Sequence, residues 1–179
     1  MTVGGDPDAA AGAAIAFLRS VLGMDERVAG RSTQSDDGTV TVPVRLASAG
    51  EGGDLDSLPV TVVSLRPEGD GWVPTSASTD QVQLATPEPN ATVSSPLALS
   101  GKANAFEGSV QVQVRQGRDP AGPVVGESVV QGSGTDELGP FSGQVDFSGA
   151  PGQGWLTLFV PSESDGQVLQ ATVVPVPLA

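Results

Sequence analysis

The sequence predicts an α+β unit, in which one helix lies on a small antiparallel sheet, followed by an all-β sandwich. Three observations predict this class. Apolar residues recur with helical spacing near the N-terminus, and short runs of alternating apolar and polar residues follow them. The 24 glycines and 15 prolines among the 179 residues fall between these runs, as turn residues do. We expect a first domain over residues 6–80 and a second over residues 81–179.

The first predicted element is a helix that begins at Asp6-Pro7-Asp8. Asp6 offers an N-cap oxygen, proline suits the first helical position, and the carboxylate of Asp8 faces the positive end of the helix. Gly23 is a residue type that commonly ends helices. The apolar stripe follows the spacing i, i+3, i+4, i+7 and i+8, and consists of Ala14, Phe17, Leu18, Val21 and Leu22.

Three strands are predicted after the helix, at residues 39–47, 58–66 and 72–78. The first alternates clearly, with valines on one face. It contains Pro43, which cannot donate a hydrogen bond to a neighbouring strand, so we expect an edge strand or a bulge there. The glycine-rich, acidic residues 48–57 are predicted to form a solvated loop.

The second half contains about seven strand-like runs separated by turns, the spacing that is typical of a β-sandwich. Val110, Val112 and Val114 alternate with polar residues, which predicts one buried face. Residues 155–160 are apolar at almost every position, as in a central strand that is covered on both sides. The predicted strands are 81–85, 95–104, 109–116, 123–131, 141–148, 154–161 and 167–176.

Composition excludes several classes of function. The formal net charge of −13 repels phosphate backbones and anionic lipids, so we expect neither nucleic-acid binding nor direct electrostatic binding to a membrane. The absence of His and Cys excludes Ser-His catalysis, thiol chemistry and cysteine-based zinc sites. No cofactor is predicted. No apolar run is long enough to cross a bilayer, and no signal peptide is visible at the N-terminus.

Several short stretches of the second half occur in a characteristic order and spacing. They are Pro89-Asn90-Ala91, Val93-Ser94-Ser95-Pro96-Leu97-Ala98-Leu99-Ser100-Gly101, Ala105-Phe106-Glu107-Gly108, Gly139-Pro140-Phe141-Ser142, 162–166 and Val173-Val174-Pro175-Val176. On these stretches, residues 81–179 resemble the immunoglobulin-like domain of bacterial spore-germination and envelope lipoproteins. The N-terminal half resembles no family that we can assign.

The resemblance implies an immunoglobulin-like sandwich outside the cytoplasmic membrane, in the envelope or at the cell surface, with no catalytic residues. It also implies that the protein reaches the membrane only through a lipid anchor. Since the sequence shows neither an export signal nor a lipid-bearing cysteine, we expect both in a segment upstream of residue 1.

Five residues are candidates for a binding surface. Phe106 and Glu107 belong to the characteristic stretch, where the phenyl ring could plug the sandwich and the carboxylate could either accept backbone hydrogen bonds or contact a partner. Trp72 and Trp155 are either exposed platforms or core anchors. Asp165 precedes a glycine, so it is either a turn residue or a ligand.

The loop carboxylates and the single lysine could in principle bind a metal ion or act in catalysis, but each also has a structural explanation. Pairs of loop carboxylates offer oxygen donors for calcium but lack the spacing of an EF-hand, so we predict no metal site. These pairs are Asp36 with Asp37, Asp54 with Asp56, and Glu163 with Asp165. Lys102, the single lysine, is expected on the polar face of its strand rather than as a catalytic base.

Three functions therefore stay open. The first is a non-enzymatic binding or scaffolding module that contacts another envelope protein or a cell-wall polymer, related to sporulation or germination proteins. The second is a small-ligand binder that uses a pocket between the N-terminal helix and its sheet. The third is a hydrolase that depends on a pair of carboxylates, a chemistry that needs two acids in one cleft.

Overall fold

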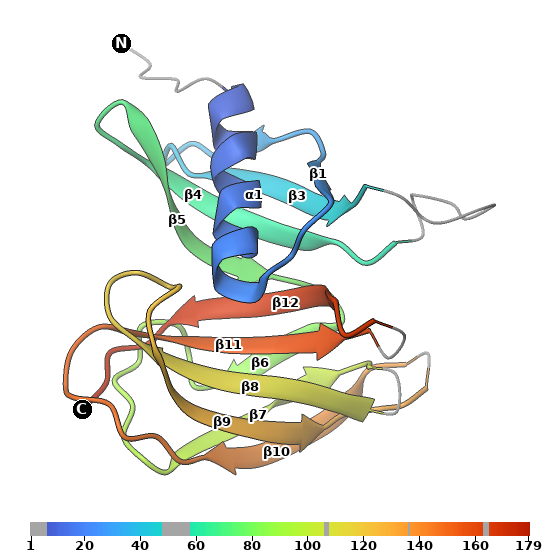
Figure 1. Ribbon diagram of the computed structural model, residues 1–179, viewed down its shortest axis with the longest axis vertical. Helices are drawn as coiled ribbons and strands as arrows, with labels where there is room; N and C mark the ends of the chain where they lie inside the picture. The colour runs from blue at the N-terminus through green and yellow to red at the C-terminus, as the bar shows by residue number, and fades with distance from the viewer. Residues whose placement is uncertain (1–6, 48–57, 106–107, 136, 163–164) are drawn as a thin grey trace. The chain divides into compact units, whose positions relative to one another are not determined.

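The computed structural model describes residues 7–47, 58–105, 108–135, 137–162 and 165–179. The chain divides into two compact units, Met1–Ala77 and Ser78–Ala179. The first unit contains a helix and a sheet, and the second contains strands β6 to β12 (Figure 1). Within the described ranges, no helix has both the length and the apolar character needed to cross a membrane.

The N-terminal unit contains the predicted helix, α1, which spans Pro7–Leu22. It ends where the sequence predicts, because Gly23 adopts a left-handed conformation with φ of 62°. The N–H of Gly23 donates to the carbonyl of Arg19 at 2.9 Å, which satisfies one of the last carbonyls of the helix. The N-cap position, Asp6, lies outside the described residues.

The sheet of this unit has the order β1-β3-β4-β5, with β2 paired to β3. Strand β3 pairs in antiparallel orientation with β1, β2 and β4. The strands are β1 (Arg27–Ala29), β2 (Thr33–Gln34), β3 (Val40–Leu46), β4 (Thr61–Glu68) and β5 (Gly71–Ser78). The helix packs over β1, β3 and β4 (Figure 1). Strands β1 and β2 were not predicted from the sequence.

The prediction for Pro43 was wrong. Its strand β3 lies in the interior of the sheet, between β4 on one side and β1 and β2 on the other. The proline is tolerated because it lies between the segments of β3 that pair with β1 and with β2. No strand there needs a hydrogen bond from a backbone N–H at this position. There its carbonyl accepts a hydrogen bond from the N–H of Gly30 at 2.7 Å.

The C-terminal unit is a sandwich of two antiparallel sheets, as predicted. One sheet has the order β12-β11-β8-β9 and the other the order β10-β7-β6. The strands are β6 (Val82–Thr86), β7 (Leu97–Ala103), β8 (Ser109–Gln116), β9 (Val124–Gln131), β10 (Gly139–Val145), β11 (Gly154–Pro161) and β12 (Val168–Pro175). All seven strands coincide with the runs that the sequence predicts.

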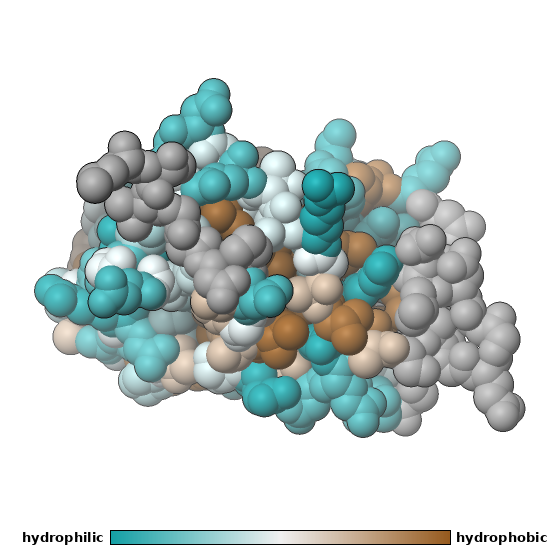
Figure 2. All heavy atoms as spheres, turned by 90° about the horizontal axis from the view of Figure 1, so that it is seen from above, coloured by the Kyte–Doolittle hydropathy of each residue, from teal (hydrophilic) through white to brown (hydrophobic). Residues whose placement is uncertain are grey.

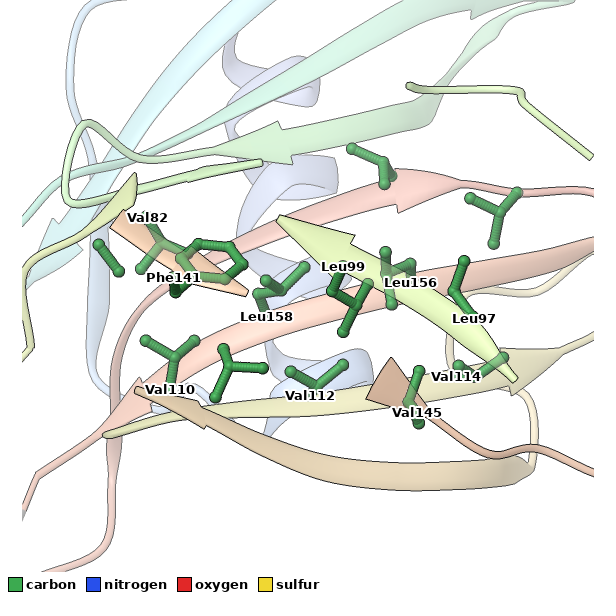
Figure 3. Packing of buried hydrophobic residues seen from close by; sticks show 14 of the residues in the cluster. Val82, Leu97, Leu99, Val110, Val112, Val114, Phe141, Val145, Leu156 and Leu158 are labelled. Atoms are coloured by element: carbon green, nitrogen blue, oxygen red, sulfur yellow. The ribbon is translucent and has the colours of Figure 1, made fainter. Parts of the chain in front are cut away.

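Aliphatic and phenyl side chains from both sheets meet in the core of the sandwich (Figure 3). The alternating valines of β8 point into this core and are at most 1% exposed. The ring of Phe141 lies so close to Gly101 that a Cβ on that glycine would be 2.7 Å from the ring carbon Cζ. Other buried side chains of this core are Val82, Leu97, Leu99, Val145, Leu156 and Leu158.

The sheet edges of the sandwich lie close to one another rather than open to solvent. On one side, β9 runs beside β10, where Ser128 Oγ donates to the carbonyl of Gln144 at 2.8 Å. On the other side, β6 runs beside β12, where Thr172 Oγ1 donates to the carbonyl of Val82 at 2.6 Å. Bonds of this kind occupy groups that an edge strand would otherwise present to another chain.

The strand registers place the loops at two opposite ends of the sandwich. At one end lie the loop after β8, the loop before β11 and the C-terminus, since Gly154 pairs with Gln116 and Trp155 pairs with Pro175. Figure 1 shows the C-terminus at this end. The connections between β7 and β8, between β9 and β10, and between β11 and β12 lie at the other end.

Candidate functional site

The five residues singled out from the sequence do not form one site. Trp72 belongs to β5 of the N-terminal unit. Trp155 stands at the start of β11, whereas Asp165 follows the end of that strand at the opposite end of the sandwich. Phe106 and Glu107 lie outside the described residues.

Asp165 fulfils a turn role. Its carboxylate Oδ1 accepts a hydrogen bond from the N–H of Gln167 at 3.1 Å, and Gly166 beside it has a φ of 72°. This is the local pattern by which an aspartate mimics a backbone turn. Trp72 is half-buried.

Trp155 is buried, with 8% of its surface exposed. Its indole N–H donates to the carbonyl of Arg118 at 3.2 Å. A buried tryptophan needs such a partner, and here the partner is the loop that joins β8 to β9. The indole therefore holds this loop and is not a free platform for sugars or peptides.

A chain of polar side chains crosses β8 and β9 near the same loop. Arg115 Nη2 donates to Gln113 Oε1 at 2.8 Å, and Gln113 Nε2 donates to Glu127 Oε1 at 2.9 Å. Arg115 Nη1 donates to the carbonyl of Gly122 at 3.2 Å, inside the loop. These residues share a face because Gln113 pairs with Glu127 in the register of the two strands.

The environment of Arg115 is partly desolvated. Burial lowers the pKa of its guanidinium below the ordinary value, and the nearby negative charge of Glu127 opposes this shift. An arginine stays protonated under such conditions. Arg115 therefore acts as a fixed cation that is committed to the loop and to the glutamine beside it.

The loop itself, residues 117–123, is fixed by further bonds. Gln116 N–H donates to the carbonyl of Pro123 at 3.0 Å, and Gly117 N–H donates to the carbonyl of Gln153 at 2.7 Å. Within the loop, the N–H of Gly122 donates to the carbonyl of Asp119 at 2.9 Å. We call residues 117–123 the β8–β9 loop.

Arg118 is exposed on the β8–β9 loop. Its carbonyl accepts the indole N–H, but its guanidinium has no hydrogen bond or ion pair to any residue that the structure describes. The neighbouring carboxylate, Asp119, makes no ion pair with it among the described residues, and its Oδ1 accepts a hydrogen bond from the N–H of Ala121 at 2.9 Å. The arrangement can bind an oxyanion, and a guanidinium can do so through two parallel hydrogen bonds.

Sequence reasoning found Trp155 but missed Arg115, Gln113 and Arg118. The alternation of β8 places Gln113 and Arg115 on one face, and this signal could have found them. The contribution of Arg118 depends on a contact with Trp155 that joins residues far apart in the chain, which periodicity does not reveal. Within the described ranges, no group of three acidic, histidine or cysteine side chains is placed to hold a metal ion.

Comparison with known proteins bears on the second half of the chain. Residues 81–167 match the family model described as the immunoglobulin-like domain of bacterial spore germination, which confirms the resemblance stated for this half. No curated protein and no solved structure matches the chain.

Proposed function

Because residues 81–167 carry the immunoglobulin-like domain of bacterial spore germination, we propose that the chain is a non-enzymatic binding or scaffolding module of the bacterial envelope. It is part of a protein that a lipid anchor holds outside the cytoplasmic membrane. Its partner is another envelope protein or a cell-wall polymer. The family match is the observation that carries this proposal.

The use of polar groups in the sandwich supports a binding role over a catalytic one. The groups that most resemble reactive ones, Arg115 and the indole of Trp155, are both bonded to loop carbonyls. Asp165 is bonded to the backbone of its own turn. Each of these three side chains therefore has a structural partner in the sandwich.

The alternative of a small ligand between the helix and its sheet receives no support. Phe17, in the apolar stripe of the helix that faces the sheet, is only 4% exposed. The strand residues beneath the helix, Val42 and Val63, have no exposed surface. These side chains form the core of the N-terminal unit and leave that function without a supporting observation.

Few large hydrophobic side chains are exposed on the surface of the described residues. Figure 2 shows hydrophilic side chains interspersed with small apolar patches on one face. Among the described residues, the large hydrophobic side chains that are exposed are Val28, Val124, Val129 and Leu138, at 38–49%. Single exposed hydrophobic side chains are normal on a monomeric protein and do not by themselves mark an interface.

Protease treatment of intact cells tests the location and the binding role together. The natural gene product, carrying an epitope tag, is expected to be digested in intact cells and to form discrete crosslinked complexes before digestion. A cytoplasmic protein of the same cells, which must stay intact, is the control. Protection of the tagged protein until lysis would contradict the proposed location, and a crosslinked sample without any complex would contradict the binding role.

A further inference from the structure

We propose that the β8–β9 loop is a protein-docking element, and that the guanidinium of Arg118 binds a carboxylate of the partner. This inference rests on the proposed function, since it names the surface and the partner chemistry of the binding module. It concerns residues 117–123 and the side chains that hold them.

The loop is longer than its connecting role requires. Strands β8 and β9 are antiparallel neighbours, and two residues suffice to join such a pair. Here seven residues separate the end of β8 at Gln116 from the start of β9 at Val124. Loops that exceed the shortest connection and are held by a rigid scaffold commonly carry binding residues.

The loop is already ordered in the free protein. Trp155 holds it from β11, Arg115 holds it from β8, and the N–H of Gly117 holds it to the carbonyl of Gln153. No Cβ can be added at Gly122 without overlapping the carbonyl of Gln116. A surface that is ordered before binding avoids the entropy cost of ordering a flexible loop on the partner.

Unlike Arg19 and Arg66, Arg118 has no ion pair to any residue that the structure describes. Arg19 is paired with Asp25 at 3.2 Å, and Arg66 is paired with Glu68 at 2.7 Å. In a chain with 21 acidic and eight basic residues, a cation without a carboxylate partner is available to an external one. The adjacent carboxylate of Asp119 is not paired with Arg118, and its Oδ1 accepts a hydrogen bond from the N–H of Ala121.

The charge of the whole chain selects the kind of partner. A net charge of −13 repels a densely anionic polymer, whereas a single carboxylate on a neutral or basic protein surface can still approach Arg118. At the foot of the loop, Val124 is 39% exposed and offers an apolar contact beside the cation. Arginine beside apolar surface is typical of the residues enriched at protein interfaces.

The test is to select short random peptides displayed on phage against the full chain, with Arg118→Gln and Lys102→Gln as matched variants. Lys102 is also exposed, on the other sheet, so its variant loses the same charge at a different place. We expect peptides with one fixed Asp or Glu on the wild type and on Lys102→Gln. For a synthetic peptide from this set, we expect about tenfold weaker binding to Arg118→Gln, and the same loss when its acid is replaced by the amide. Circular dichroism checks that both variants fold.

The outcomes separate this inference from the proposed function. Selected peptides that bind wild type and Arg118→Gln equally would overturn the docking role of Arg118 and leave a binding module. Arg118-dependent sedimentation with purified peptidoglycan, without any acidic peptide preference, would overturn the choice of a protein partner. If no peptide is enriched on the wild-type chain, the inference is contradicted, whereas the binding role is tested separately by the crosslinking of the tagged protein.

Discussion

Two buried threonines of the sandwich differ only in whether their hydroxyl has a partner. Thr172 is 5% exposed, and its Oγ1 donates to the carbonyl of Val82 at 2.6 Å. Thr157 has no exposed surface, and its Oγ1 has no partner among the described residues. A buried hydroxyl without a partner costs free energy, while a bonded one stabilises two groups at once.

The same substitution should therefore have opposite consequences at the two positions. Thr172→Val leaves the carbonyl of Val82 without its partner and should lower the free energy of unfolding by about 1–3 kcal/mol. Thr157→Val removes an unsatisfied group and should leave the free energy of unfolding unchanged or slightly higher. Urea denaturation at one pH measures both. An equal loss at the two positions would show that the hydrogen bond to Val82 does not matter.

Asp37 provides a prediction on pH. The N–H of Thr39 donates to its Oδ1 at 2.9 Å, and the hydrogen bonds from Thr39 hold the pKa of the Asp37 carboxyl below its ordinary value. The folded state therefore favours the ionised form. This stabilisation is present above the pKa of the unfolded chain and is lost as the pH falls through the folded-state pKa. NMR titration of the side-chain carboxyl should give a midpoint below about 4, the usual aspartate value, and a midpoint above it would refute the hydrogen bond.

At the scale of the elements, alternation predicted strands with one buried face, such as β8, and a continuous apolar run predicted β11, which is buried on both faces. The runs 109–116 and 154–161 coincide with β8 and β11. Strands β1 and β2 are three and two residues long, too short for any period to be visible. The error at Pro43 has the same origin, since the break between these two strands depends on pairing rather than on local pattern.

Two glycines in different elements should respond oppositely to alanine. A Cβ at Gly101 of β7 would overlap the carbonyl of Gln83 and lie 2.7 Å from the ring of Phe141, so Gly101→Ala should cost about 3 kcal/mol. Gly12 of α1 has no atom within 4 Å of its added Cβ, so Gly12→Ala should stabilise by about 0.5–1 kcal/mol. Thermal unfolding of both variants measures the contrast, and a stabilised Gly101→Ala would contradict the packing between the two sheets.

The candidate site was less predictable than the fold. Trp155 could be chosen because tryptophan is rare in this chain, but its partner Arg118 lies 37 residues earlier in the sequence. For Asp165 the sequence left a turn role and a ligand role open, and the hydrogen bond from Gln167 to its carboxylate is the contact of a turn. Turn chemistry is local and therefore readable, while contacts between loops depend on the register of β8 against β11.

At the scale of the whole molecule, the charge imbalance gives a prediction on salt. Repulsion among the excess carboxylates destabilises the compact state, and added salt screens it over a Debye length that falls from about 30 Å at 0.01 M to about 8 Å at 0.15 M. The free energy of unfolding should therefore rise between these two concentrations of sodium chloride at neutral pH. A fall would mean that surface ion pairs such as Arg66 with Glu68 outweigh the net repulsion.

The same imbalance constrains function. An acidic module with few free cations discriminates against polyanions by long-range repulsion, and it can use a single arginine for a local contact. This division of roles requires that the arginine stand on a preformed surface. The rigidity of the β8–β9 loop is therefore the claim on which the molecular account depends most.

Backbone ¹⁵N relaxation of the free, full-length chain measures this rigidity directly. The amides of Gly117, Arg118, Asp119, Ala121 and Gly122 should have order parameters near 0.85, like those of the flanking strands, because side chains from β8 and β11 hold the loop. Order parameters below about 0.6 at these amides would contradict a preformed docking surface.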